Sequence, residues 1–184
     1  MRTARLELRR WREEDRDAFV AIWTDPDVRG ALRPGETRDP AAVANARFDG
    51  QLRHWHEHGF GLWAASERAS AEIAGWIGAW HPDFIPELTA EIELGWSLRR
   101  SYWGRGLATE GAQAALEAVS VHLGPPRVIS IIDPGNEPSA AVARRLGMRD
   151  SRGAVHPELG LEVRVYERAL RGPGRSSLAP CPAA

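Results

Sequence analysis

Gly104 and Gly106 stand one residue apart, directly before a stretch of helical periodicity and shortly after Arg99 and Arg100. Glycine lacks a Cβ atom, so the backbone at these positions can approach a ligand closely. The first turn of the following helix offers unpaired backbone N–H groups and the positive end of the helix dipole. With the nearby arginines, this arrangement is typical of a site that binds an anion such as a phosphate group.

The glycine pair by itself is compatible with an anion site and with a simple tight turn, in roughly equal measure. The sequence lacks the Gly-Lys-Ser or Gly-Lys-Thr ending of a nucleoside-triphosphate loop and the third glycine of a dinucleotide-binding loop. About half of the chain also precedes the pair, whereas a dinucleotide loop usually follows the first strand. Both nucleotide interpretations are therefore disfavoured.

Composition limits the remaining possibilities. The 184 residues, with a net charge of −1 and 43% hydrophobic content, suit one domain with a well-filled core. We expect that domain over residues 1–170 and a disordered tail over residues 171–184, which are rich in Gly, Pro, Ser and Ala. The nearly neutral charge predicts no general affinity for nucleic acid or membranes, and no apolar run reaches membrane-spanning length. The single cysteine, Cys181, favours a reducing, cytoplasmic setting.

Three histidines, His54, His56 and His58, raise the possibility of a metal site. Alternate positions on the helix predicted there point in different directions around the axis, so the three side chains would not converge on one ion. No cysteine is near them. We therefore expect no metal.

The hydrophobic pattern predicts the elements that position the glycine pair. Strands with alternating or continuous apolar residues are expected at 6–9, 61–66, 73–80, 90–98, 128–132 and 161–166. Helices are expected at 13–24, 40–58, 107–122 and 137–146, with Asp39 and Asn136 as N-caps of the second and fourth. Residues 28–38, rich in Gly, Pro and Arg, are predicted to form a loop, with room for a short helical turn. The order of elements indicates a mixed sheet flanked by helices.

The helix after the glycine pair is expected to pack tightly on the sheet, because its inward positions are small residues. The predicted inward stripe is Ala108, Gly111, Ala115, Val119 and His122.

Several motifs in this order resemble one family. Residues Tyr102–Glu110, preceded by Ala90–Trp96, resemble the acyl-CoA motif of the GCN5-related N-acetyltransferases (GNAT family), most closely its RimJ/RimL-like branch. Asn136–Ser139 and Arg145–Met148 resemble that branch's Asn-x-x-Ser and Leu-Gly-Phe signature, and Thr3–Arg9 resembles its opening strand. The resemblance implies an α+β fold with a mixed, mostly antiparallel sheet of about six to seven strands and about four helices.

The resemblance also implies acetyl-CoA as acyl donor. The pyrophosphate would then lie on backbone N–H groups between Trp103 and Ala108, and the pantetheine arm would follow the strand from Glu93 to Leu98. A bulged or splayed strand there would expose N–H groups that polarise the thioester carbonyl. The cofactor-binding residues implied are Leu94, Trp96, Ser97, Leu98, Arg99, Trp103, Gly104, Arg105, Gly106, Leu107, Ala108, Thr109, Asn136 and Ser139.

Two residues become candidates for catalysis under this resemblance. An amine that attacks a thioester must first lose a proton, and Glu93, one strand step from the expected thioester, is the leading base. A carboxylate that only closes a hydrogen bond in the sheet would fit Glu93 nearly as well, and Glu91 shares its face. Ser139 resembles the serine proposed to protonate the departing thiolate, although a simple contact with CoA or a place in the first helical turn fits equally.

The function expected is transfer of an acetyl group to a primary amine, with a protein or peptide N-terminal α-amine as first choice. A small-molecule amine, such as an antibiotic or a polyamine, and a non-catalytic acyl-CoA-binding module remain alternatives. Residues 28–38 and 81–88 are expected to select the acceptor, and Trp23, Trp55 and Trp80 are candidates for lining its pocket. A homodimer is expected by analogy only.

Overall fold

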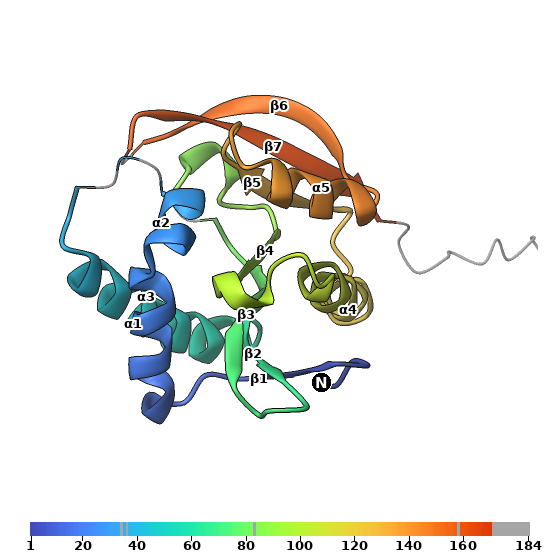
Figure 1. Ribbon diagram of the computed structural model, residues 1–184. Helices are drawn as coiled ribbons and strands as arrows, with labels where there is room; N and C mark the ends of the chain where they lie inside the picture. The colour runs from blue at the N-terminus through green and yellow to red at the C-terminus, as the bar shows by residue number, and fades with distance from the viewer. Residues whose placement is uncertain (34, 36, 83, 158, 171–184) are drawn as a thin grey trace, which may run out of the picture.

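The computed structural model describes residues 1–33, 35, 37–82, 84–157 and 159–170, so the tail predicted at 171–184 lies outside the described residues. One seven-stranded sheet with helices on both faces makes up the fold (Figure 1). The strands are β1 (Leu6–Arg9), β2 (Leu62–Glu67), β3 (Ile73–Trp80), β4 (Glu93–Leu98), β5 (Arg127–Ile132), β6 (Arg149–His156) and β7 (Leu161–Ala169). The helices are α1 (Arg16–Thr24), α2 (Pro26–Leu32), α3 (Pro40–His58), α4 (Leu107–His122) and α5 (Glu137–Arg145), with 3-10 turns η1 (Glu13–Asp15), η2 (Pro86–Leu88) and η3 (Arg100–Tyr102). In this part of the chain, no helix is long and apolar enough to cross a membrane.

The sheet has the order β1-β2-β3-β4-β5-β7-β6. Neighbouring strands are antiparallel except β4 and β5, which are parallel. The predicted antiparallel meander of β2, β3 and β4 is confirmed. Gly75 permits the close approach of β3 to β4, because a Cβ atom there would lie 2.0 Å from the carbonyl oxygen of Ser97.

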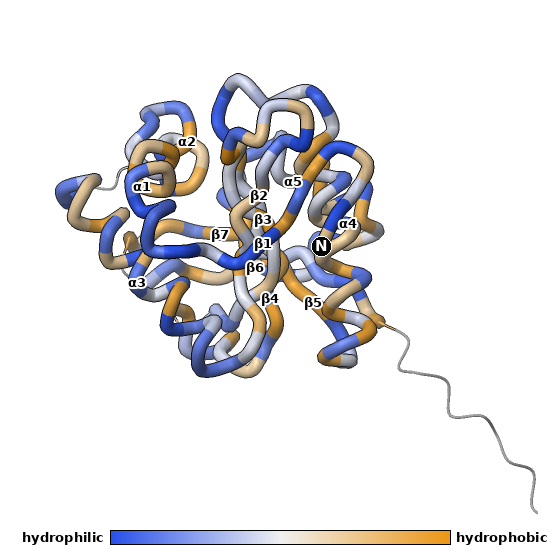
Figure 2. The backbone as a smooth tube through the Cα atoms, turned by 90° about the horizontal axis from the view of Figure 1, so that it is seen from below, coloured by the Kyte–Doolittle hydropathy of each residue, from blue (hydrophilic) through white to orange (hydrophobic). Residues whose placement is uncertain are grey.

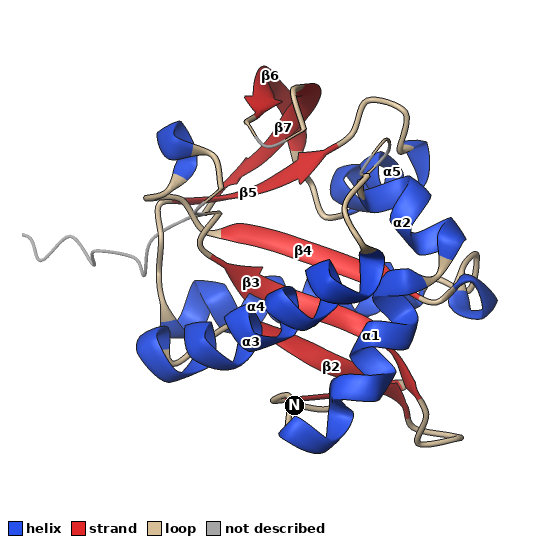
Figure 3. Cartoon of the chain, turned by 90° about the vertical axis from the view of Figure 1, so that its left-hand side faces the viewer, coloured by secondary structure: helices blue, strands red, loops and turns tan. Residues whose placement is uncertain are grey.

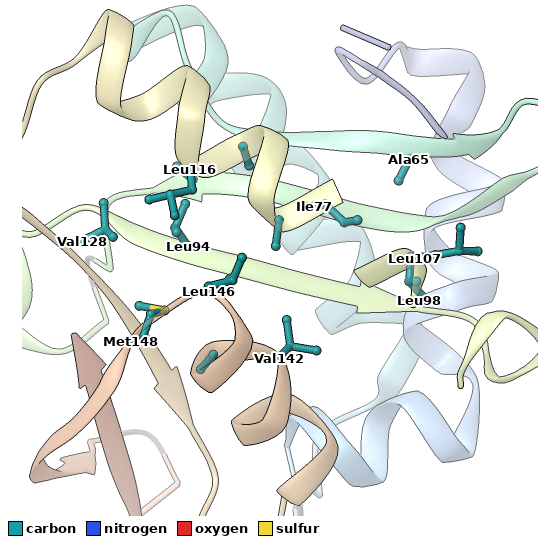
Figure 4. Close-up of a cluster of buried hydrophobic side chains, with 14 of the residues drawn as sticks. Ala65, Ile77, Leu94, Leu98, Leu107, Leu116, Val128, Val142, Leu146 and Met148 are labelled. Atoms are coloured by element: carbon teal, nitrogen blue, oxygen red, sulfur yellow. The ribbon is translucent and has the colours of Figure 1, made fainter. Parts of the chain in front are cut away.

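Helices α1, α2 and α3 cover one face of the sheet, and α4 and α5 cover the other (Figure 2). The side chains of β3 alternate between the two faces, as period-two patterning requires. Trp76 packs under α1, with its ring 5.0 Å from that of Phe19. Ile77 points to the opposite core, which it shares with Leu94 and Leu116 (Figure 4).

Helix α4 packs on the sheet through small residues, as predicted. A Cβ atom on Gly111 would lie 2.4 Å from Cδ1 of Ile77, so the glycine lets the helix lie close to β3. Ala115 and Val119 of the predicted stripe are buried. The prediction was wrong for His122, which is exposed at the last turn, where the helix has passed the edge of the core.

Strands β4 and β5 separate soon after they meet. The registered pairing between them in the described residues is Glu93 with Ile129, and Figure 3 shows β5 turning away from the line of β4. The separation matches the splayed strand that the family resemblance implied, and it divides the sheet where the predicted functional residues lie.

The fold differs from the prediction at one helix. Residues 28–38 were expected to form a loop with at most a short helical turn, but Pro26–Leu32 form the seven-residue helix α2, which makes five α-helices among the described residues instead of about four. The side chain of Asp25 accepts hydrogen bonds from the N–H groups of Asp27 and Val28, and Pro26 occupies the first turn. The Asp25-Pro26 pair thus ends α1 and also begins α2.

One strand was also missed. Residues Arg149–His156 form β6, yet most of its residues are exposed, so no apolar alternation marks it in the sequence. Strand β6 is held by its pairing with β7 and by Arg164, whose Nη2 donates to Asp150 Oδ1 over 2.6 Å. With seven strands, the sheet lies within the predicted range.

Candidate active site

The glycine loop adopts the conformation that its sequence requires. Gly104 and Gly106 have φ angles of 72° and 75°, in the left-handed region that favours glycine. Gly106 is the N-cap of the sixteen-residue helix α4, whose first N–H groups have no carbonyl partner within the helix. A Cβ atom on Gly104 would meet nothing within 4 Å, so the loop leaves open space over its backbone. The loop and the helix end thus have the backbone geometry that an anion cradle would need.

The three arginines near this loop differ in their surroundings. Arg100 stacks over the ring of Trp103 at 4.8 Å and lies 3.9 Å from Asp27. Arg105 forms an ion pair with Glu67. Arg99 is half-buried, and its Nε atom is buried with no hydrogen-bond partner in the described part of the chain. Arg99 is therefore the arginine of the three best able to serve a bound anion.

The N-terminal segment holds the glycine loop from outside. Glu110, in the first turn of α4, accepts hydrogen bonds from the Thr3 hydroxyl at 2.6 Å, from the Arg5 backbone N–H at 2.8 Å and from Arg5 Nε at 2.7 Å. Arg5 Nη1 also donates to the carbonyl oxygen of Arg105 at 2.7 Å. We call Thr3, Arg5 and Glu110 the N-terminal clasp. Burial opposes ionisation of Glu110, but the bonds from Thr3 and Arg5 outweigh it and lower the pKa of its carboxyl group.

Backbone groups of β4 face the gap between β4 and β5. The carbonyl oxygens of Ile92 and Leu94 accept bonds from Ile129 N at 2.9 Å and from Ser130 Oγ at 2.7 Å, so alternate residues of β4 face β5. Trp96 is the next residue with this orientation, beyond the single registered pair. An extended ligand entering the gap would therefore meet the backbone of β4 at Leu94 and Trp96.

The other predicted cofactor residues lie around this gap and the loop. The side chains of Leu94, Leu98 and Leu107 are buried in the core (Figure 4), so only their backbone is available to a ligand. Ser97 is half-buried opposite Trp76, and Ala108 and Thr109 are half-buried in the first turn of α4. Trp103 donates through Nε1 to the Leu98 carbonyl oxygen, which anchors the start of the glycine loop to β4.

Glu93 stands at the point where β4 and β5 separate, and the residue is 7% exposed. Oε2 accepts a hydrogen bond from Nε1 of Trp80 at 2.8 Å, and Oε1 accepts a longer one of 3.4 Å from the N–H of Ile131. The carboxylate lines a cavity of about 160 Å³. A buried carboxylate that is held in place and still borders open space can accept a proton from a group bound beside it.

Glu91 is placed differently. Its carboxylate pairs with Arg127, and this hydrogen bond lowers the pKa of Glu91. Glu91 does not border the cavity that Glu93 lines. Sharing a face with Glu93 is therefore not enough to bring Glu91 to this cavity, because Arg127 holds its carboxylate.

Asn136 and Ser139 come together at the N-terminus of α5. The Asn136 side chain accepts from the N–H of Ser139 at 3.1 Å, which confirms it as the N-cap. Its amide group donates to the carbonyl oxygen of Ala31 at 2.8 Å and so joins α5 to α2. Both residues border the same cavity as Glu93. The structure thus brings Ser139 of α5 and Glu93 of β4 to one cavity.

The cavity wall away from α5 is aromatic. Trp23 and Trp80, two of the three predicted tryptophans, line it, and the Trp23 ring lies 5.7 Å from that of Trp76. Trp55 does not line it, because its Nε1 donates to the carbonyl oxygen of Leu62 in the interior. Residues from both expected selector segments reach the wall. From residues 28–38 these are Ala31, Leu32 and Arg33, and from residues 81–88 Phe84.

Sequence reasoning missed several residues of this wall, notably Arg47 and Gln51 of α3. The guanidinium of Arg47 lies 5.5 Å from the ring of Trp23 and 5.9 Å from that of Trp80. The available signal was Gln51, a polar residue among the apolar inward positions of the predicted helix.

The histidines also differ from the prediction. His54 and His58 are one turn apart on α3, and their ring centroids lie 4.5 Å apart. His81 joins them, with its ring 5.0 Å from that of His58. They were expected to point apart, but only His56 does not take part in these contacts. Among the described residues, no group of three or more His, Cys, Asp or Glu side chains could hold a metal ion.

Known proteins resemble this chain in sequence. Residues 5–149 match the family model described as an acetyltransferase (GNAT) domain. The uncharacterized protein YkkB of Bacillus subtilis (strain 168) is 30% identical over 166 residues, which cover 84% of this chain and 88% of that protein. The uncharacterized N-acetyltransferase p20 of Bacillus licheniformis is 25% identical over 174 residues, or 91% of this chain and 86% of that protein.

Solved structures of acetyltransferases resemble this chain in fold. An acetyltransferase from Agrobacterium tumefaciens str. C58 superposes with a TM-score of 0.76 at 30% identity, over 91% of this chain and 92% of that chain. RimL, a ribosomal L7/L12 α-N-protein acetyltransferase in complex with coenzyme A, has a TM-score of 0.70 at 19% identity, over 91% and 96%. The likeness to RimL is one of fold. From the family model and the relatives together, the chain belongs to the GNAT family of acetyltransferases.

Proposed function

We propose that this protein transfers the acetyl group of acetyl-CoA to a primary amine, and that its first acceptor class is the α-amine of a protein or peptide N-terminus. The observation that carries the proposal is Glu93. Its buried carboxylate is held by Trp80 at the opening between β4 and β5 and borders a cavity. This placement suits a base that acts beside a ligand lying along β4.

The residues present fit acetyl-CoA. Gly104 leaves open space over the loop, the first N–H groups of α4 point out of the helix end, and Arg99 has a buried Nε atom without a partner in the described residues. We propose that these groups hold the pyrophosphate and that the β4 backbone at Leu94 and Trp96 bonds the pantetheine arm. When bound, acetyl-CoA would supply the acetyl group activated as a thioester.

Glu93 would accept the proton of the acceptor amine, directly or through a water molecule. An α-amine has an ordinary pKa near 7.7–8.0 and is mostly protonated at neutral pH, so removal of its proton is needed before it can attack. A lysine side chain, near 10.4, would need a stronger bias. The α-amine is therefore the better match to a single carboxylate base.

Ser139 would donate a hydrogen bond or a proton to the departing sulfur. It borders the same cavity as Glu93, and Asn136 fixes its backbone through the N-cap bond. A thiol with a pKa near 8.5 leaves readily, so the loss of this hydroxyl should slow the reaction less than the loss of Glu93.

A small-molecule amine is the second candidate acceptor. The cavity beside Glu93 is only about 160 Å³ and has aromatic walls, which suits a compact amine with an apolar body.

Release of the CoA thiol, measured with a panel of amines, tests the proposal. The panel contains peptides that begin with Ser, Ala, Met or Phe, together with polyamines, aminoglycosides and small aromatic amines. We expect turnover with at least one class, and mass spectrometry should find one added acetyl group on its amine. Tight acetyl-CoA binding without turnover on any amine would point to a binding module. Failure of acetyl-CoA to shift the melting temperature would contradict the proposal altogether.

A further inference from the structure

Gln51 interrupts an otherwise apolar surface. The other buried residues of α3 are Ala44, Phe48 and Trp55, which face the sheet as an amphipathic helix requires. Gln51 is 3% exposed, and in the described part of the chain its Oε1 atom has no hydrogen-bond partner. A buried polar atom without a partner lowers stability, so this oxygen calls for an explanation other than packing.

The position of Gln51 offers an explanation for its unpartnered oxygen. It lines the cavity that Glu93 borders and also a second cavity of about 530 Å³ along α3. Arg47, Trp80 and Phe84 line both cavities as well, so the two cavities lie on either side of these shared residues. Trp80 donates its Nε1 hydrogen bond to Glu93, which places this shared wall beside the proposed base.

The two cavities suit the two parts of a peptide acceptor. The smaller cavity, with Glu93 and aromatic walls, suits an amine and the side chain next to it. The larger cavity offers a route for the residues that follow. The first peptide bond would then cross the wall where Gln51 lies. That bond carries an N–H group, which an ester, a free amino acid or an alkylamine lacks at the same place.

We propose that Oε1 of Gln51 accepts the N–H of the first peptide bond of the acceptor and thereby makes the enzyme selective for peptide N-termini. This inference rests on the proposed function and names the residue that reads its preferred acceptor. The ligand supplies the hydrogen bond that the free protein lacks. A buried acceptor of this kind discriminates strongly against an analogue that cannot donate to it, because the oxygen then stays unpaired.

The test compares a short peptide with the matching depsipeptide, in which an ester replaces only the first peptide bond. For the wild-type protein we expect kcat/KM for the peptide to exceed that for the ester by about tenfold or more, the effect of one hydrogen bond to a buried group. In Gln51→Met the ratio should fall to about one, with the ester rate changed by no more than about threefold. The melting temperature of Gln51→Met should stay equal or rise, because an unsatisfied polar atom has been removed.

Gln113→Met is the matched control. Gln113 lies on α4, where its Nε2 donates to Glu117 at 2.9 Å, and it lines neither cavity. This variant should keep the wild-type preference. Gln51→Leu repeats the test with a second apolar side chain, should Gln51→Met fail to fold.

Other results would overturn the inference. It is wrong if the wild-type ratio of kcat/KM for peptide and ester is near one, or if both Gln51 variants keep the wild-type ratio. It is also wrong if the melting temperatures of both variants lie well below that of the wild type. Turnover of amines without any preference for the peptide would leave the proposed function standing and remove only this inference. Absence of turnover on every amine would remove both.

Discussion

The substitution Glu110→Gln tests what the N-terminal clasp contributes to stability and to acetyl-CoA affinity, without changing the rest of the site. Glutamine keeps one oxygen that can accept from Thr3 and from the backbone N–H of Arg5. Its amide NH2 group would then replace the carboxylate oxygen that now lies 2.7 Å from Arg5 Nε. Two donors would face each other, so the ion pair is lost while the helix surface keeps its shape.

The size of the effect follows from the exposure of the pair. A hydrogen bond to a charged group contributes about 1.5–3 kcal/mol to the free energy of unfolding. The Arg5 side chain is 48% exposed, and water replaces part of that contribution, so we expect a loss of about 1 kcal/mol. For a chain of this length the melting temperature should fall by about 2–4 °C. Arg5 also bonds the Arg105 carbonyl, so acetyl-CoA affinity should fall by up to about fivefold.

Denaturant unfolding and acetyl-CoA titration at pH 7 measure both effects, with Glu117→Gln on the same helix as control. The lowered pKa of Glu110 gives a further check. Its contribution to stability is complete above the ordinary value of 4.5 and is lost as the pH falls through the lower folded-state value. The difference between wild type and Glu110→Gln should therefore shrink below pH 4.5. Equal effects of the two substitutions on stability and affinity would refute the role of the clasp.

Two further substitutions test interactions that stabilise the fold. Gly75→Ala places a Cβ atom 2.0 Å from the Ser97 carbonyl oxygen, so the β3–β4 pairing must shift, and we expect a loss of about 3 kcal/mol or more in chemical denaturation. Gly30→Ala is its control, because a Cβ there meets nothing within 4 Å and a helix interior favours alanine, with a gain of up to about 1 kcal/mol. Asp15→Asn removes the negative charge of a buried carboxylate that accepts two Arg9 hydrogen bonds, of 2.6 and 2.8 Å, and turns one of the two oxygens into an NH2 donor that faces the guanidinium, which should cost about 2–3 kcal/mol at pH 7. The Arg9 hydrogen bond lowers the pKa of Asp15, so this contribution should fade as the pH falls below 3.8, and unchanged stability at pH 7 would count against the account.

Local signals made much of the fold and part of the site predictable. The spacing of Gly104 and Gly106, the N-cap at Asn136 and the alternation in β3 each follow from rules that act within a few residues. Helix α2 escaped prediction because Asp25-Pro26 serves equally well to stop one helix and to start the next. Strand β6 escaped it because its residues face solvent, and only pairing with β7 keeps it extended.

The residues on the acceptor side of the site are brought together by contacts between segments that are far apart in sequence. Arg47 and Gln51 reach the cavity because α3 lies across the face of the sheet opposite α4, which no local pattern reveals. The same holds for Glu91 and Glu93, two residues apart in sequence. Pairing with Arg127 holds one, and Trp80 holds the other beside the cavity.

The pH dependence of kcat/KM for wild type and Glu93→Gln, on one accepted peptide, tests the central claim most directly. If Glu93 takes the proton of the amine, the variant should be slower by about 10²–10⁴-fold at pH 7 while acetyl-CoA affinity stays the same. The kcat/KM of Glu93→Gln should rise about tenfold per pH unit up to about pH 8, where the free amine is deprotonated. The difference in kcat/KM between the variant and the wild type should therefore become smaller over this range. A Glu93→Gln enzyme that matches the wild-type rate at pH 7 would contradict the account and leave Glu93 as a buried support for Trp80.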